Sequence, residues 1–317
     1  MNTTGTVPAA VSTFYDRKML TKAKASLVHN KYAQVRDIPR NNTEAIRFRR
    51  YSLLAPSLDT IVEGVTPSLD TLSITNVDAT VQQYGRGYLL TDKLLFTTLD
   101  PVLLEVADIL GENAGNTLDQ ITREELNTTT TIQYASTATA NSGVTAAMVI
   151  DADEVKEAVR TLKNNNAKKI TSMVNASDGY NTSPVDACYI GIVHPNTVFD
   201  LKGATGFIRV EEYGQRKAME NEVGALDEVR FIETTNAKVF AGEGASSIDV
   251  YSTLIIGSDF YAITRVAGEA MKNIVKAPGS AGTADPFDQR QTSAWKATFV
   301  ATILNDAFGL SLRHAVS

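Results

Sequence analysis

The longest regular pattern in this sequence is an amphipathic segment between residues 100 and 128. Asp100 suits the N-cap of a helix and Pro101 suits its first turn. Apolar side chains then recur at spacings of three and four residues, at Leu103, Ala107, Leu110, Ala114, Leu118 and Ile121. At about 1.5 Å per residue, a helix of this length spans roughly 40 Å. We therefore predict that it forms the spine of the fold.

Upstream of this helix, two segments alternate apolar and polar residues, as β-strands do. They cover residues 45–51 and 72–84 and are separated by a stretch, 53–70, that is rich in turn-forming and apolar residues. A change of phase at Asn76 predicts a β-bulge. We expect a long two-stranded arm whose tip has no core of its own. Because isolated hairpins are marginally stable in water, such an arm implies a partner surface.

The charge of the chain is unevenly distributed. The 317 residues carry a formal net charge of −6, yet residues 1–50 hold ten Lys and Arg against three Asp and Glu, a net charge of +7. From about Phe14 to Tyr32 these cations alternate with apolar residues at helical spacing, which predicts a basic amphipathic helix that ends before Pro39. Three interpretations stay open for this arm: it binds nucleic acid, it lies across an acidic surface of a neighbouring copy, or it is a solvated helix face.

The side chains that we expect to contact other subunits come from the basic arm and the hairpin. They are Arg17, Lys18, Lys22 and Lys24 in the arm, Arg47, Arg49 and Arg50 at the hairpin base, and Glu63 near its tip. As a hypothesis, the arginines and the arm pair with acidic surface on adjacent subunits.

The rest of the chain mixes helices and strands without a strict alternation. A helix opens at Asp151 or Asp153 and ends near Asn164, a buried strand covers 187–193, and a short helix covers 196–201. Further strands are predicted at 229–234, 250–257, 262–266, 271–276, 295–305 and 310–313. This order predicts an α+β fold of about two domains.

The residues that usually carry catalysis or bind metal are sparse. The three histidines, His29, His194 and His314, lie far apart in the sequence, and the single cysteine, Cys188, sits in an apolar strand. Pairs of glycines such as Gly85 and Gly87 lack the rest of a phosphate-binding loop and are read as turns. The sequence has neither a secretory signal nor an apolar stretch of about 20 residues for a membrane span. We therefore predict a protein that is not an enzyme and has no catalytic, cofactor or metal site.

Several segments, in order along almost the whole chain, carry a family resemblance. They read IVEGVTP (61–67), QQYG (82–85), LTD (90–92), LGENA (110–114), IGIVHPNT (190–197), DPFDQR (285–290), AWK (294–296) and ATILND (301–306). Taken together they resemble the N4-like major capsid proteins of tailed bacteriophages, within the HK97-fold superfamily. One departure is Ser293-Ala294, where the family often has glycine before its Trp-Lys pair.

This resemblance implies an HK97-like division of the chain. An N-terminal arm would cover 1–43, an E-loop hairpin 44–91, a peripheral domain with the spine helix 92–146 and 270–317, and an axial domain 147–269. It also implies self-assembly into hexamers and pentamers of an icosahedral head around double-stranded DNA, without sequence-specific binding and without a membrane. A separate scaffolding protein, a portal and a decoration protein are the further partners expected. The protein would be part of the virion, after assembly in the host cytoplasm.

Two alternatives belong to other classes of protein. The first is an encapsulin-like shell subunit, which shares the fold and encloses a protein cargo instead of DNA. The second is a nucleic-acid-binding module that uses the basic arm, and it predicts DNA affinity with a steep dependence on salt. A hydrolase is the least favoured, because no constellation of catalytic residues is visible.

Overall fold

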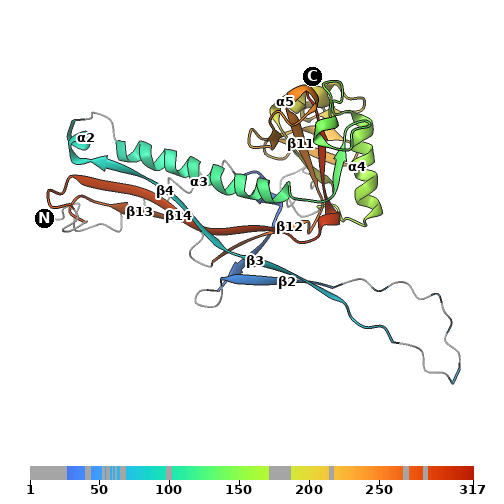
Figure 1. The fold of residues 1–317 in the computed structure, drawn as a ribbon, viewed down its shortest axis with the longest axis horizontal. Helices are drawn as coiled ribbons and strands as arrows, with labels where there is room; N and C mark the ends of the chain where they lie inside the picture. Colours follow the sequence, from blue (N-terminus) through green and yellow to red (C-terminus); the bar gives the residue numbers. More distant parts are fainter. Residues whose placement is uncertain are drawn as a thin grey trace, which may run out of the picture.

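The protein is an elongated sheet with a spine helix, from which a hairpin arm and a globular module extend (Figure 1). The computed structural model describes residues 27–39, 44–51, 69–97, 102–170, 187–213, 218–266, 271–280 and 285–317, with Leu54, Leu58, Thr60, Glu63 and Gly64. The expectations for the basic segment up to residue 26, and for Asp100 and Pro101, lie outside these residues.

The spine helix α3 covers Val102–Leu126, which confirms the longest predicted element. It packs along a five-stranded peripheral sheet in which β14 (Arg290–Ile303) is central. The neighbours of β14 are β4 (Gln82–Thr91) on one side and β13 (Lys272–Lys276) followed by β12 (Tyr261–Val266) on the other. A short helix, α2 (Asp92–Thr97), follows β4 at the far end of this sheet.

Alternate side chains of β14 build the core beneath the spine. Trp295, Ala297 and Phe299 are buried with Leu110 and Ala114 of α3 in one apolar cluster. The indole Nε1 of Trp295 also donates a hydrogen bond of 3.1 Å to the side-chain oxygen of Asn113. The apolar face of the helix and the apolar face of the strand, each predicted from its own periodicity, therefore pack against each other in one core.

The predicted β4 region differs from the structure. We expected the strand to end at Tyr84 and Gly85 and Gly87 to form a turn, but both glycines lie inside β4, paired with Lys296 and Ala294. A Cβ on Gly87 would meet the Cβ of Ala294 at 2.6 Å, and one on Gly85 would meet the carbonyl oxygen of Trp295 at 2.7 Å. The two glycines are thus required by a close approach of strands, which no local sequence pattern reveals.

The predicted helix that ends near Tyr32 is wrong over its described part. His29–Tyr32 form a single turn of 3₁₀ helix, η1, and the chain continues as strand β1, Gln34–Ile38. β1 pairs in parallel with β12 at the edge of the peripheral sheet. This strand follows directly after the predicted helix, and its partner edge is distant in the sequence.

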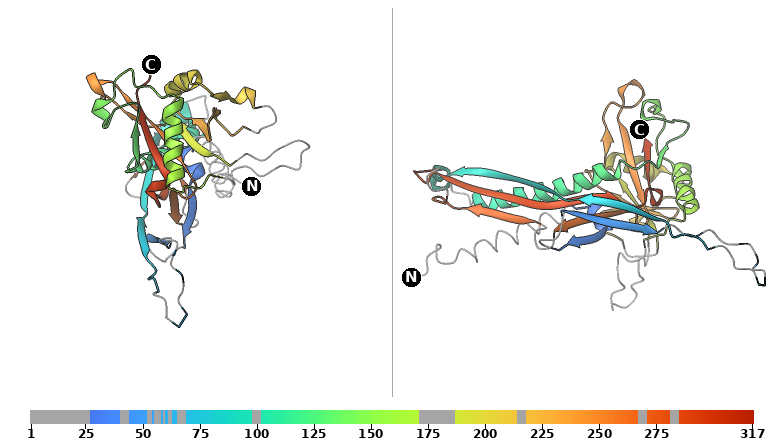
Figure 2. Two further views of the ribbon diagram at one scale, coloured as in Figure 1. Left: turned by 90° about the vertical axis from the view of Figure 1, so that its right-hand side faces the viewer. Right: turned by 60° about the horizontal axis from the view of Figure 1, so that its bottom comes forward.

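The hairpin consists of β2 (Ala45–Tyr51) and β3 (Ile74–Thr80). Its ladder runs from the Ala45–Thr80 pair to the Tyr51–Ile74 pair without a shift of register, so the predicted bulge at Asn76 is wrong. The apparent change of phase instead reflects the exposure of most of β3. Figure 2 shows the hairpin running outward from the end of the sheet nearer the globular module.

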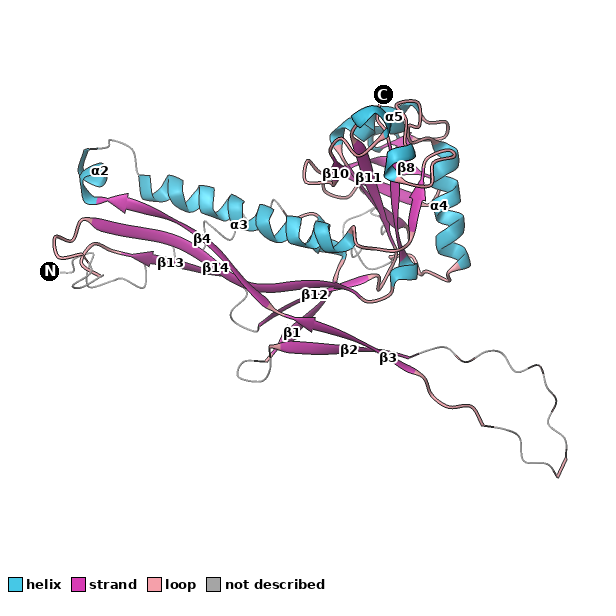
Figure 3. Ribbon diagram, viewed as in Figure 1, coloured by secondary structure: helices cyan, strands magenta, loops and turns pink. Residues whose placement is uncertain are grey.

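The globular module, called the axial module here, is built around an eight-stranded sheet. Its order is β5 (Ile132–Tyr134), β15 (Gly309–His314), β11 (Val250–Ile256), β6 (Tyr189–Val193), β9 (Val229–Glu233), β8 (Glu222–Leu226) and β7 (Ile208–Arg209), with β10 (Val239–Phe240) beside β11. Helices α4 (Ala152–Asn164) and α5 (Pro195–Gly203) accompany the sheet. Short 3₁₀ turns lie at Asn141–Gly143, Val210–Glu212, Ala245–Ser247 and Asp306–Phe308. Figure 3 distinguishes this mixed module from the sheet and its spine, and the fold is α+β as predicted.

The predicted start of α4 is confirmed, while α5 begins one residue earlier than predicted, at a proline. The side chain of Asp151 accepts hydrogen bonds from the backbone N–H groups of Asp153 and Glu154, at 2.7 and 3.3 Å, and begins α4. Pro195 occupies the first turn of α5, where the absent N–H of proline costs nothing. Local chemistry alone decides both helix starts.

Candidate intersubunit surfaces

The hairpin leaves the body with apolar side chains that nothing described covers. At its base, Phe48 and Ala79 pack against Ala262 of the peripheral sheet. Beyond the base, Leu58 and Leu69 are 93% and 89% exposed, and Leu54 and Leu72 are also exposed. Exposed leucines on a projecting arm are typical of a surface that contacts another protein.

The three hairpin arginines have different surroundings. The guanidinium of Arg47 donates two hydrogen bonds, at 2.6 and 2.8 Å, to the carboxylate of Asp78 on the opposite strand. This contact holds the pKa of Asp78 below its ordinary value. Arg50 donates to the side-chain oxygen of Asn305 at 2.7 Å, whereas Arg49 makes no ion pair with any described residue. Sequence reasoning missed the Asp78 partner because register, not proximity along the chain, brings it opposite Arg47.

The remaining predicted contact residues divide between the tip and the arm. Glu63 lies in the hairpin tip and is exposed. Arg17, Lys18, Lys22 and Lys24 precede the described residues. The structure therefore places only the hairpin members of the predicted set.

The root of the basic arm is fixed to the spine by Asp119, a residue that sequence reasoning missed. One oxygen of its buried carboxylate accepts the backbone N–H groups of Val28 and His29, at 2.8 and 2.7 Å. The other oxygen lies 2.8 Å from Nδ1 of the His29 ring, and the carbonyl of His29 accepts a hydrogen bond from the Tyr261 hydroxyl. A buried acid on an otherwise apolar helix face was the available signal, because such a group needs partners. The arm thus departs from a rigid point.

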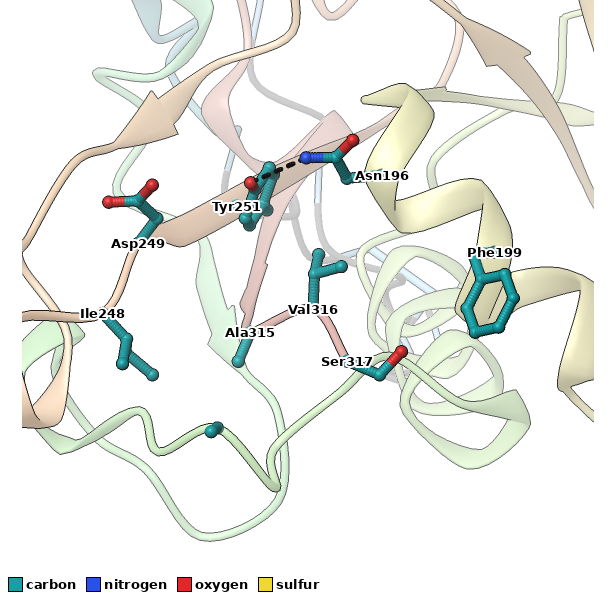
Figure 4. A pocket seen from close by; sticks show the side chains of 9 residues that line it. Asn196, Phe199, Ile248, Asp249, Tyr251, Ala315, Val316 and Ser317 are labelled. Atoms are coloured by element: carbon teal, nitrogen blue, oxygen red, sulfur yellow. Dashed lines mark hydrogen bonds between the residues drawn. The ribbon is translucent and has the colours of Figure 1, made fainter.

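A shallow hollow lies on the axial module (Figure 4). It has a volume of about 440 Å³ and lies between α5, the start of β11 and the last residues of the chain. Asn196 donates a hydrogen bond of 3.0 Å to the Tyr251 hydroxyl, and the Ser317 hydroxyl donates one of 2.6 Å to Asp200. Phe199 on its rim is 76% exposed. The rim of the hollow is apolar and its polar side chains already have hydrogen-bond partners. This arrangement favours contact with another protein over catalysis.

The histidines and the cysteine have structural surroundings. His194 caps α5 by accepting the N–H of Asn196 at its Nδ1, and burial lowers its pKa. His314 is completely buried in β15, and burial lowers its pKa to about 4. Cys188 is buried beside β6. Each of these side chains is therefore accounted for by packing or capping.

Two searches over the described residues place limits on other kinds of site. No group of three or more His, Cys, Asp or Glu in the described part is arranged to hold a metal ion. No helix within the described ranges is both long and apolar enough to cross a membrane. Exposed surfaces of the described part of the chain include the hairpin, the arm root, the sheet and the axial hollow.

A spine helix on a curved sheet, a projecting hairpin and a separate mixed module make up a fold that this chain shares with solved structures of phage capsids. The chain is similar to the capsid protein of Ralstonia phage GP4, with a TM-score of 0.68, 13% identity, and coverage of 92% of this chain and 88% of that one. The capsid protein of cyanophage Pam1 gives a TM-score of 0.64 and 15% identity over 92% and 93% of the two chains. The virus-like particle of Pyrococcus furiosus gives a TM-score of 0.53 and 10% identity over 94% and 97%.

The sequence comparison is more specific than the fold. The profile of the family described as phage capsid protein matches residues 75–310, which is most of the chain. No curated protein matches the sequence. The chain belongs to the phage capsid protein family, and its role is that of a structural subunit of the virion. The predicted resemblance to bacteriophage capsid proteins is confirmed, while membership of the N4-like group stays a prediction.

Proposed function

We propose that copies of this chain assemble into hexamers and pentamers that close into an icosahedral head around double-stranded DNA. The observation that carries this proposal is the hairpin, which exposes four leucines far from any core of its own. An arm of this kind gains stability only by ordering on another surface. Many such contacts, each of modest strength, make a stable shell because the copies are linked multivalently.

We propose that the chain is divided into domains as HK97-like capsid proteins are. Residues 1–43 act as an arm, 44–91 as the E-loop hairpin, 92–146 with 270–317 as the peripheral domain, and 147–269 as the axial domain. A separate scaffolding protein, a portal and a decoration protein complete the head, and assembly takes place in the host cytoplasm. The chain itself has no catalytic role. The acidic remainder of the chain, residues 51–317 with 20 Lys and Arg against 33 Asp and Glu, suits a container whose wall must release DNA.

The test is assembly of the full-length chain, alone and with its scaffolding protein. Sedimentation and negative-stain microscopy should show closed particles of uniform size. A variant in which residues 54–72 are replaced by a short Gly-Ser linker should keep its far-ultraviolet circular dichroism and lose particle formation. A wild-type chain that stays a monomer with its scaffold present would refute the proposal.

The content of the particles separates this proposal from the encapsulin-like alternative. Fold similarity extends to the virus-like particle of Pyrococcus furiosus, at a lower TM-score than to the two phage capsids described above. Particles purified from infected cells should contain nuclease-protected DNA. A protein cargo in place of DNA would favour the alternative.

A further inference from the structure

The root of the basic arm fixes the direction in which the chain runs beside the spine. The carboxylate of Asp119 accepts the backbone N–H of Val28 at 2.8 Å. Three residues further along α3, the hydroxyl of Thr122 donates to the side-chain oxygen of Asn30. The chain therefore runs in the same direction as the helix at this point. Followed back from Val28, it points toward the earlier residues of α3.

The side of α3 that holds this root is acidic along the rest of the helix. Its carboxylates are separated by three, four and seven residues, a spacing that places them on one side of a helix. They belong to Glu105, Asp108, Glu112 and Asp119. Residues 102–122 contain neither Lys nor Arg. Glu105, Asp108 and Glu112, with Ile109 beside them, are called the acidic face here.

The acidic face is open within the described part of the chain. Glu105 and Glu112 are exposed and form no ion pair with any described residue, and Ile109 is 49% exposed. A hollow of about 530 Å³ lies beside the face, lined by Val28, Glu112 and residues of the axial module, and its described lining includes no Lys or Arg. Figure 3 shows the first half of α3 with the peripheral sheet on one side and no other described element alongside. A segment that enters from Val28 has a free path along the face.

Apolar residues just before the root continue an existing contact. Leu27 packs against the core beneath the spine. Leu20, Ala23 and Leu27 are spaced three and four residues apart, as on one side of a helix. The sequence predicts such a helix from about Phe14, and its three apolar residues are called the arm stripe here. Because the last of them already contacts the core of the spine, the stripe is directed toward α3.

The cations of the same segment divide into two pairs. In a helix, Arg17 and Lys24 flank the arm stripe, whereas Lys18 and Lys22 lie on the opposite side. Seven residues separate Arg17 from Lys24, the same spacing as between the two glutamates of the acidic face. In two parallel helices, both pairs are then about 10 Å apart along the axis. The flanking cations and the glutamates therefore match in spacing as well as in charge.

The lengths of the two stretches also agree. Fourteen residues separate Phe14 from Val28, and fourteen separate Glu105 from Asp119. As helices, both stretches span about 21 Å. With Val28 held at Asp119, the segment reaches the level of Glu105 without a linker. Because segment and spine belong to one chain and are joined at this root, the effective concentration favours its own spine over that of a neighbour.

We infer that residues 14–26 dock as a helix on the acidic face of the spine of their own chain. The arm stripe lies against Ile109, and each flanking cation faces one glutamate. The ion pairs are Arg17 with Glu105 and Lys24 with Glu112. This docking goes beyond the proposed assembly, because it concerns a single chain before any contact between copies. It also sets the point from which residues 1–13 depart, at the end of α3 that Figure 1 shows farthest from the axial module.

Hydrogen exchange of the unassembled full-length chain tests the docking. In the wild type, the amides of residues 17–24 should exchange more slowly than in an unstructured chain of the same sequence, by about tenfold or more. Arg17→Glu with Lys24→Glu should remove this protection, because like charges then face each other. Glu105→Lys with Glu112→Lys should do the same, and combining the four substitutions should restore the protection. Lys, Arg and Glu have similar helix propensities, so the helix itself is not the variable.

Lys18→Glu with Lys22→Glu is the matched control, because it makes the same change of net charge on the opposite side of the helix. This variant should keep the protection of the wild type. Exchange in β14 shows that each variant is folded. Equal loss of protection in the control and in Arg17→Glu with Lys24→Glu, or a wild type without protection, would refute the inference.

Cross-linking separates the chain's own spine from other partners. Unassembled ¹⁴N- and ¹⁵N-labelled chains are mixed, treated with a zero-length carbodiimide and analysed by mass spectrometry. Links between Lys24 and Glu112 within one isotope are expected. Mixed-isotope links in their place would assign the segment to a neighbouring copy and overturn the inference, as would protection that appears only after DNA is added. Failure to form particles would count against the proposed assembly alone.

Discussion

His314 provides a titration that reports directly on the packing of the axial module. Its ring is completely buried in β15. The Nδ1–H donates to the carbonyl of Ala315 at 2.7 Å, so Nε2 accepts the hydroxyl of Thr253 at 3.0 Å. Both ring nitrogens are therefore satisfied in the neutral form, and burial lowers the pKa of His314 to about 4. Protonation must then oppose folding.

The size of the effect follows from linkage. The unfolded chain binds the proton with a pKa of about 6.5, while the folded chain resists it until about pH 4. Between these values the unfolded state binds more protons, so the free energy of unfolding falls as the pH is lowered. Above about pH 6.5 this contribution is fully present. By pH 4.5, the His314 contribution to the free energy of unfolding is lower by about 2.5 kcal/mol than at pH 7.

The measurement compares unassembled wild-type chain with His314→Gln, which cannot titrate. Urea denaturation at pH 7.0 and pH 4.5 gives the loss of stability for each protein. The loss should be larger for the wild type by about 2 kcal/mol, whatever the stability of the variant at pH 7. Equal losses in the two proteins would show that His314 is not held neutral, and the reasoning would fail.

Three further substitutions test other parts of the fold. Asp119→Ala should lower the free energy of unfolding by about 3 kcal/mol, because two backbone N–H groups and the His29 ring lose a buried acceptor; hydrogen exchange at Val28 and His29 should rise. Trp295→Ala should cost about 3–5 kcal/mol by denaturation, since it opens a cavity under the spine. Gly87→Val should prevent β4 from pairing with β14 and yield insoluble chain, while Gly203→Ala, where a Cβ meets nothing, should remain soluble.

The principal helices could be predicted from the local sequence pattern alone. The spine was predictable because its apolar residues repeat at three and four positions over 25 residues, and a helix needs only its own sequence to satisfy its backbone. The start of α4 was predictable from Asp151 for the same reason. The exposed apolar hairpin was predictable from strand alternation on either side of a turn-rich stretch.

The strands that were missed depend on distant partners. β1 exists because β12 offers a parallel edge more than 200 residues later in the chain. β4 continues through Gly85 and Gly87 because β14 approaches too closely for any side chain. Neither partner is visible from the residues of the strand itself.

The sequence by itself determined the lengths and types of the principal helices, the presence of an arm without a core, and the opposite charges of the leading segment and the rest of the chain. Only the tertiary structure decided which charged side chains stand opposite one another: Arg47 meets Asp78 across the hairpin, whereas Lys272 stands opposite Lys296 in the peripheral sheet. The reason is physical. A helix closes its hydrogen bonds within a few residues, but a sheet places side chains together by register between segments far apart in the chain.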